Sequence, residues 1–87
     1  MEASSFILEF HSHLTRDSWH NFLLAVGTAG ASSNWLSPNR VELTCIKRSQ
    51  LQHVGYIVFK VGVPALCKVV GVSGEAKIQA GEYKNQA

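Results

Sequence analysis

The sequence has few charged residues, few cysteines and no long apolar segment, and each shortage excludes a class of protein. Charged residues make up 16% of the 87 positions, whereas 46% are hydrophobic. The longest apolar runs, such as 22–26 and 56–59, are far shorter than the roughly 18 to 20 residues that cross a bilayer. The sequence therefore predicts no membrane-spanning helix. The acidic Glu2 stands where a secretory signal would carry a positive charge, so we expect no signal peptide.

Only two cysteines are present, Cys45 and Cys67. Both lie in apolar segments that resemble strands, and burial in apolar surroundings makes a thiol inert. The cytoplasm keeps such thiols reduced, whereas secreted proteins of this size often depend on disulfides. We therefore expect two buried, reduced thiols in a cytoplasmic protein.

The recognised catalytic and ligand-binding motifs are also missing. The sequence contains no glycine-rich phosphate loop, no HExxH and no CxxC. His11 and His13 are spaced to share a metal ion on a strand, and His20 offers a third nitrogen. No acidic residue or cysteine is placed by the sequence to complete that site. The sequence therefore predicts a protein that is not an enzyme and has no cofactor or metal, with metal binding by the histidine pair left open.

The strongest pattern that is present covers residues 53–61, which are rich in β-branched and aromatic side chains. Its apolar residues fall on both faces, which is typical of a strand covered on both sides. Residues 6–13 and 40–47 alternate between apolar and polar, as half-buried strands do. We therefore expect 53–61 to be the central strand of a sheet, joined to 40–47 by a hairpin.

One helix is expected after the first strand. Apolar residues recur at helical spacing from Trp19 to Val26, behind an acidic Asp17 that suits the start of a helix. Two glycines mark its end. Residues 31–39 then have the composition of a loop, although the Trp-Leu pair within it is too apolar to remain in water. We expect this pair to dock on another surface.

The C-terminal third completes the predicted fold. Residues 64–72 are either a short helix, because a proline stands at the start, or a strand, because two adjacent valines follow. Residues 75–80 alternate and predict a last strand, and 82–87 are polar and expected to fray. The prediction is one α+β domain over 1–87, with a mostly antiparallel sheet of four to five strands, the order β-α-β-β-β-β and one helix on one face.

One helix cannot cover such a sheet, so its other face is expected to be exposed and partly apolar. That face would carry Ile7, Ile46, Tyr56 and Val58. The favoured function is a small protein-binding module, an inhibitor or accessory subunit that occludes or bridges a partner. Its expected contact residues are Trp35, Leu36, Ile46, Tyr56 and Val58. A homodimer is a second expected arrangement, either face to face through this patch or edge to edge through an unprotected edge strand.

The alternative function is weak nucleic-acid binding. The net charge is +2, which permits a phosphate-bearing partner without requiring one. The candidate residues are Lys47, Arg48, Lys60 and Lys77. Because three glutamates interrupt these positive charges, the sequence favours the protein-binding hypothesis.

Overall fold

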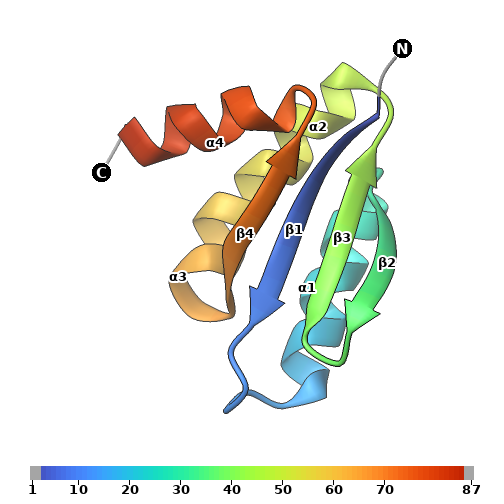
Figure 1. Ribbon diagram of the computed structural model, residues 1–87. Helices are drawn as coiled ribbons and strands as arrows, with labels where there is room; N and C mark the ends of the chain where they lie inside the picture. The colour runs from blue at the N-terminus through green and yellow to red at the C-terminus, as the bar shows by residue number, and fades with distance from the viewer. Residues whose placement is uncertain (1–2, 86–87) are drawn as a thin grey trace.

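The computed structural model describes residues 3–85, which form four strands and three helical segments (Figure 1). The second helical segment runs without interruption through α2, a π-helical turn, η1, and a short α3. The bounds of the elements are β1 (Ser4–Phe10), α1 (Arg16–Thr28), β2 (Ser32–Ser37), β3 (Arg40–Cys45), α2 (Arg48–Ile57), η1 (Val58–Gly62), α3 (Val63–Ala65), β4 (Cys67–Ser73) and α4 (Ala76–Asn85). The predicted α+β class and antiparallel sheet are confirmed, whereas the predicted order β-α-β-β-β-β with one helix agrees only in its first four elements.

The four strands form one antiparallel sheet in the order β2-β3-β1-β4. Helices α1 and α2 lie side by side on one face, behind the sheet in Figure 1. Each of these helices connects two strands that are separated by a third, which is the split β-α-β topology known as ferredoxin-like. β2 and β4 are therefore the two edges, and β1 is a central strand.

The core lies between the sheet and these two helices. The strands β1 and β3 alternate as predicted, and their inward side chains are almost completely buried. The core residues of β1, β3, α1 and α2 are Phe6, Leu8, Phe10, Val41, Leu43, Cys45, Trp19, Phe22, Val26, Leu51 and Val54. The ring of Phe10 stacks on Trp19 with 5.0 Å between centroids, and it meets Phe22 edge-on at 6.1 Å. Aromatic contacts therefore fix α1 on β1.

The predicted central strand at 53–61 is wrong, because these residues lie in α2 and η1. Leu51, Val54 and Val58 are buried, and their spacing of three and four puts them on one face of a helix. Burial of that face outweighs the preference of β-branched residues for strands. The predicted hairpin onto 40–47 is wrong for the same reason.

A proline ends this helical segment. Proline has no backbone N–H, so Pro64 cannot donate to the carbonyl four residues earlier. The helix widens just before it: the N–H of Val63 donates to the carbonyl of Val58, five residues back. The N–H of Leu66 then donates to the carbonyl of Gly62 at 2.7 Å, and β4 follows. Segment 64–72 thus contains both structures that the sequence left open.

Three further expectations are corrected. Residues 31–39, expected as a loop, contain β2 and the turn that joins it to β3. Residues 75–80, expected as a strand, contain the first turns of α4, because Ala76 and Gln79 are the buried side chains there. Of the tail 82–87, expected to fray, the part up to Asn85 is helical and positions 86–87 lie outside the described residues.

The open face of the sheet is polar, contrary to expectation. Glu9, near the end of the central strand β1, pairs with Arg40 at 2.9 Å and with Lys68 at 3.1 Å. These two hydrogen-bonded cations lower the pKa of the Glu9 carboxyl, Lys68 contributing more. The hydroxyls of Ser5 and Ser73 are 2.5 Å apart on the same face. The residues predicted to form one apolar face therefore do not lie together on the open face of the sheet. Ile7 is half-buried, Tyr56 lies on α2, and Val58 is fully buried in the core.

Candidate functional site

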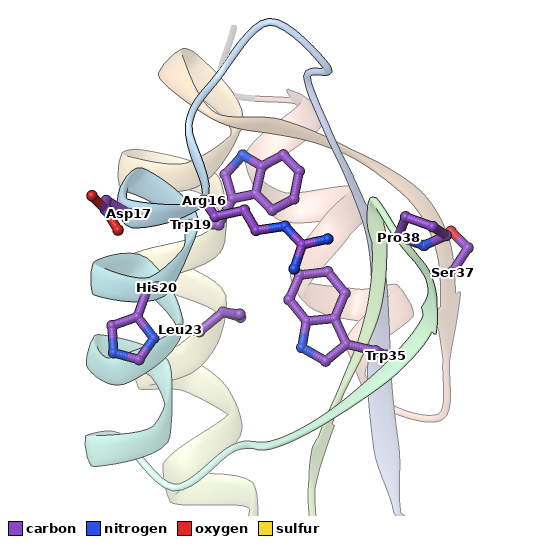
Figure 2. A pocket seen from close by; sticks show the side chains of 8 residues that line it. All are labelled: Arg16, Asp17, Trp19, His20, Leu23, Trp35, Ser37 and Pro38. Atoms are coloured by element: carbon purple, nitrogen blue, oxygen red, sulfur yellow. The ribbon is translucent and has the colours of Figure 1, made fainter.

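A cavity of about 590 Å3 lies between helix α1 and the edge strand β2, and we call it the α1–β2 groove (Figure 2). Its lining residues are Arg16, Asp17, Trp19, His20, Leu23, Trp35, Ser37 and Pro38. In the sheet of residues 3–85, β2 pairs with β3 alone. The groove therefore runs beside a strand that has one side free to accept another strand.

An aromatic cluster extends from the core into the groove. Trp19 and Trp35 have ring centroids 6.1 Å apart, and both contact Phe10, at 5.0 and 6.0 Å. Trp19 is only 7% exposed, whereas Trp35 is 47% exposed. Trp35 lies opposite Val41 in the ladder between β2 and β3, which turns its side chain to the helix side. Trp35 is therefore a large apolar surface that the core holds in place and that water still reaches.

Arg16 gives the groove its charge. Figure 2 shows its guanidinium reaching from α1 toward β2, whereas the side chains of Asp17 and His20, which also line the groove, do not reach toward that strand. The ion pairs found among residues 3–85 involve Arg40, Arg48 and Lys68. Arg16 takes part in none of them. A ligand in the groove would therefore meet a positive charge.

The two sheet edges are protected to different degrees. β4 carries Lys68, has an irregularity opposite Ile7 and Leu8, and has α4 packed beside it. Such features hinder pairing with a further strand. β2 has no charged residue and no proline, and its side chains are exposed or half-exposed. Its pairing with β3 is irregular only near the turn, between Trp35 and Ser37. β2 is therefore the edge more open to strand addition.

A second cavity of about 510 Å3 lies between β4, η1 and α4. Tyr83 of α4 stacks on Phe59 with 5.0 Å between ring centroids, and the ammonium of Lys60 lies 5.5 Å from the centroid of the Tyr83 ring. Burial, helped by the neighbouring Glu82 and Tyr56, raises the pKa of the Tyr83 hydroxyl. These contacts hold α4 on η1, so we read this cavity as part of the packing of α4.

The structure separates the five residues expected to bind a partner. Trp35 and Leu36 are both exposed on β2, at 47% and 50%. Ile46 is exposed after β3, and Tyr56 is exposed on α2 beside the α4 helix. Val58 is fully buried, so its assignment to a binding surface is wrong. Only the pair on β2 adjoins the groove.

Of the residues that line the groove, only Trp35 was expected to bind a partner, and Arg16 and Leu23 are among those that were missed. Their spacing of seven places them on the same face of α1, next to Trp19. This stripe was visible in the sequence as part of an amphipathic helix. Its role was hidden because 31–39 was expected to be a loop, so no strand was available to form the other wall.

Two of the four basic candidates, Arg48 and Lys60, already have partners within the fold. The Nε of Arg48 donates to Glu75 at 2.9 Å, and this pairing raises the pKa of Arg48 and lowers that of Glu75. Lys60 lies over Tyr83, whereas Lys47 precedes α2 and Lys77 lies on α4. The described open face of the sheet carries no aromatic side chain on which a base could stack. The arrangement does not favour the nucleic-acid alternative.

The histidine pair and the cysteines are also placed. The rings of His11 and His13 stack with 5.7 Å between centroids, but residues 3–85 contain no group of three or more metal-ligating side chains. Metal binding by this pair stays a hypothesis.

Cys45 and Cys67 are free and buried, as predicted. Burial raises the pKa of both thiols, that of Cys67 to about 11, so neither is a nucleophile near neutral pH.

Comparisons of the chain with protein-family models, curated proteins and solved structures found no match. Within the described range, no helix combines the length and apolar character needed to cross a membrane. We therefore infer the function from the geometry of the α1–β2 groove and of the two sheet edges.

Proposed function

We propose that this chain is a small, non-enzymatic protein-binding module that adds an extended segment of its partner to the free edge of β2. One observation carries the proposal: an uncharged, exposed edge strand borders a cavity into which a firmly held tryptophan projects. Strand addition of this kind is a recurring mode of peptide recognition. In that mode the main chain supplies affinity, and pockets for alternate side chains supply specificity.

The partner strand would lie about 4.8 Å from β2 and form main-chain hydrogen bonds with it. Because successive side chains of a strand point to opposite faces, every second side chain would enter the α1–β2 groove. There it would meet Trp35 and Leu23. The remaining side chains would project over the polar open face, where they add little. The six residues of β2 would pair with a segment of similar length.

Binding one extended segment of the partner is sufficient for the biological role that we propose. A segment held as a strand is unavailable for its own contacts, so a small chain can act as an inhibitor by occlusion or as an accessory subunit by bridging. Two buried thiols suit a reducing compartment, and we propose the cytoplasm as its location.

The test begins with a library of random peptides displayed on phage and long enough to span β2. Peptides enriched on this protein should alternate between apolar and other residues. NMR spectra of the labelled protein should then show the largest shifts in β2 and along the groove face of α1, and slower hydrogen exchange for amides on the free edge of β2.

Trp35→Ala should weaken the binding of the selected peptides by about tenfold or more, because it removes the anchor of the groove. Leu24→Ala is the matched control, since Leu24 is also a large exposed side chain, 56% exposed, but does not line the groove. Equal effects of the two substitutions, or shifts that map to the cavity beside α4, would rule out the proposed site.

A further inference from the structure

We infer that the partner segment carries a side-chain carboxylate, from aspartate or glutamate, which Arg16 binds beside the indoles of Trp19 and Trp35. This inference rests on the proposed strand addition at β2, and it names the chemistry that the groove selects.

The charged side chains of the groove do not all extend toward β2. Three charged or titratable residues line the groove, Arg16, Asp17 and His20. In Figure 2 only the guanidinium of Arg16 extends across the groove to the β2 side. In the same view Asp17 and His20 do not reach toward β2, although both line the cavity. A strand lying along β2 would therefore meet the guanidinium of Arg16, which reaches farther toward β2 than the Asp17 carboxylate of the same groove.

Within the described residues Arg16 has no ion pair, like Lys47 and Lys77, but of these three cations only Arg16 lines the groove. Arg40 and Lys68 pair with Glu9, Arg48 pairs with Glu75, and Lys60 lies over Tyr83. Among residues 3–85, no carboxylate lies within ion-pair distance of Arg16. Its planar guanidinium presents paired N–H donors that match the two oxygens of a carboxylate. The groove therefore complements an anion of that shape.

The walls of the groove strengthen such a contact. Trp19 and Trp35 form the apolar wall of the groove that Arg16 also lines, with 6.1 Å between their ring centroids. An incoming strand would cover the open side and reduce the water around the ion pair, and a charge pair is stronger in a medium of lower polarity. On an open surface, an ion pair of the same guanidinium would contribute little to the binding free energy.

A side-chain carboxylate fits better than the carboxylate at the end of a chain. Chain-end carboxylates are typically bound by clusters of backbone N–H groups, which need residues of positive φ. Within residues 3–85, positive φ occurs only at Gly30 and Gly74, and neither lines the groove. The geometry thus offers the arginine side chain as the anion-binding group, and a segment can pass it without ending there.

The positions of Arg16 and Leu23 also predict the spacing between the acidic residue and the apolar residue of the partner segment. Arg16 and Leu23 are seven residues apart on α1, which corresponds to roughly 10 Å along the helix. Side chains on one face of a strand repeat every second residue, at roughly 7 Å. The acidic residue should therefore stand two or four positions from an apolar residue that reaches Leu23 and Trp35.

The experiment uses the selected peptides in synthetic form, all with amidated C-termini. Replacing the peptide's Glu by Gln, or Arg16 by Gln in the protein, should each weaken binding by about tenfold to a hundredfold, as expected for a charge-assisted pair. When both changes are made, the loss of binding affinity should be no larger than the loss caused by either change alone. Arg16→Glu should prefer peptides that carry Lys in place of Glu. Lys77→Gln, which removes an exposed cation outside the groove, should leave binding unchanged.

The outcomes separate this inference from the proposal on which it rests. Peptides that bind through Trp35 but show no enrichment of Asp or Glu, and bind Arg16→Gln equally well, would overturn the carboxylate while leaving strand addition intact. Peptides that require a free C-terminus instead of the acidic side chain would overturn it in favour of a chain end. Absence of any selected peptide would overturn both. Circular dichroism of each variant checks that the fold is retained.

Discussion

Gly62 allows η1 to approach α1 so closely that a larger side chain would collide with Phe22. A Cβ atom at this position would lie 2.8 Å from two atoms of the Phe22 ring. We expect Gly62→Ala to lower the free energy of unfolding by about 1 to 3 kcal/mol, the usual cost of overpacking a core. Urea unfolding followed by circular dichroism measures the change.

Gly27 supplies the control for that substitution. It lies near the end of α1, and a Cβ there would meet nothing within 4 Å. Gly27→Ala should therefore raise the free energy of unfolding by about 0.5 to 1 kcal/mol, through better helix propensity. Equal stability of the two variants would show that η1 does not approach α1 as described.

Cys67 makes stability depend on pH at the alkaline end. Burial raises the pKa of its thiol from 9.0 to about 11, so the folded protein resists forming the thiolate that the unfolded chain forms more readily. Its contribution is complete below about pH 9 and is lost as the pH rises through about 11, a loss of roughly 2 to 3 kcal/mol. Urea unfolding over this range should show a steeper decline for the native chain than for Cys67→Ala, and parallel declines would contradict it.

The docking of α4 depends on a small aromatic contact. Tyr83 stacks on Phe59 and receives the ammonium of Lys60 above its ring. Tyr83→Ala should cost about 1 to 2 kcal/mol, from the lost ring pair and the lost cation contact. Because Tyr83 lies in the C-terminal part of α4, beyond the buried Ala76 and Gln79, the amides of that part should exchange faster while those of β1 keep their protection. Ile78→Ala, which truncates an exposed residue of the same helix, should leave both unchanged.

The elements that the sequence predicted correctly are those whose burial alternates in a simple way. β1 and β3 each have one face in the core and one on the polar side, so their residues alternate as expected. α1 buries a single stripe, from Trp19 to Val26. In these three elements the local pattern and the final burial agree, and the pattern alone was sufficient.

The failures have specific physical causes. Segment 53–61 has a strand-like composition, but the spacing of Val54 and Val58 determined its structure. In 75–80 the alternation was coincidental, since Ile78 is exposed and Gln79 is buried. β2 has almost no burial pattern, because it is a strand only through its pairing with β3.

The same limit applies to the candidate site. Trp35 could be singled out from the sequence, because a tryptophan in a polar segment needs an explanation. Arg16 could not, because its importance depends on α1 lying beside β2, which is a property of the tertiary fold. Val58 was misplaced because its segment was assigned to the wrong kind of element.

At the scale of the whole molecule, the polar open face changes the expected mode of self-association. A face-to-face dimer would have to bury Glu9 with its two cations, which is costly. The free edge of β2 is the better contact, since antiparallel pairing of two β2 strands is compatible with a two-fold axis. We expect reversible dimers, joined by this edge, at the high concentrations used for NMR.

Sedimentation equilibrium of two lysine variants tests the edge. Asn34→Lys adds a charge to β2 and should leave only the 9.5 kDa monomer, because edge lysines oppose strand pairing. Thr44→Lys adds the same charge to β3 inside the sheet and should not change the mass distribution. A native chain that stays monomeric at every concentration, or dimers that survive Asn34→Lys, would refute edge pairing.

The position of β1 has a consequence for synthesis on the ribosome. The first strand to be made is a central one, and its partners are β3 and the much later β4, so that Ser5 pairs with Ser73. Until residues 67–73 have emerged, one side of β1 has no strand to pair with, and its large apolar side chains lack part of their cover. The growing chain therefore passes a long interval in which it can pair with other chains, and during that interval chaperones should bind the segment that later becomes the middle of the sheet.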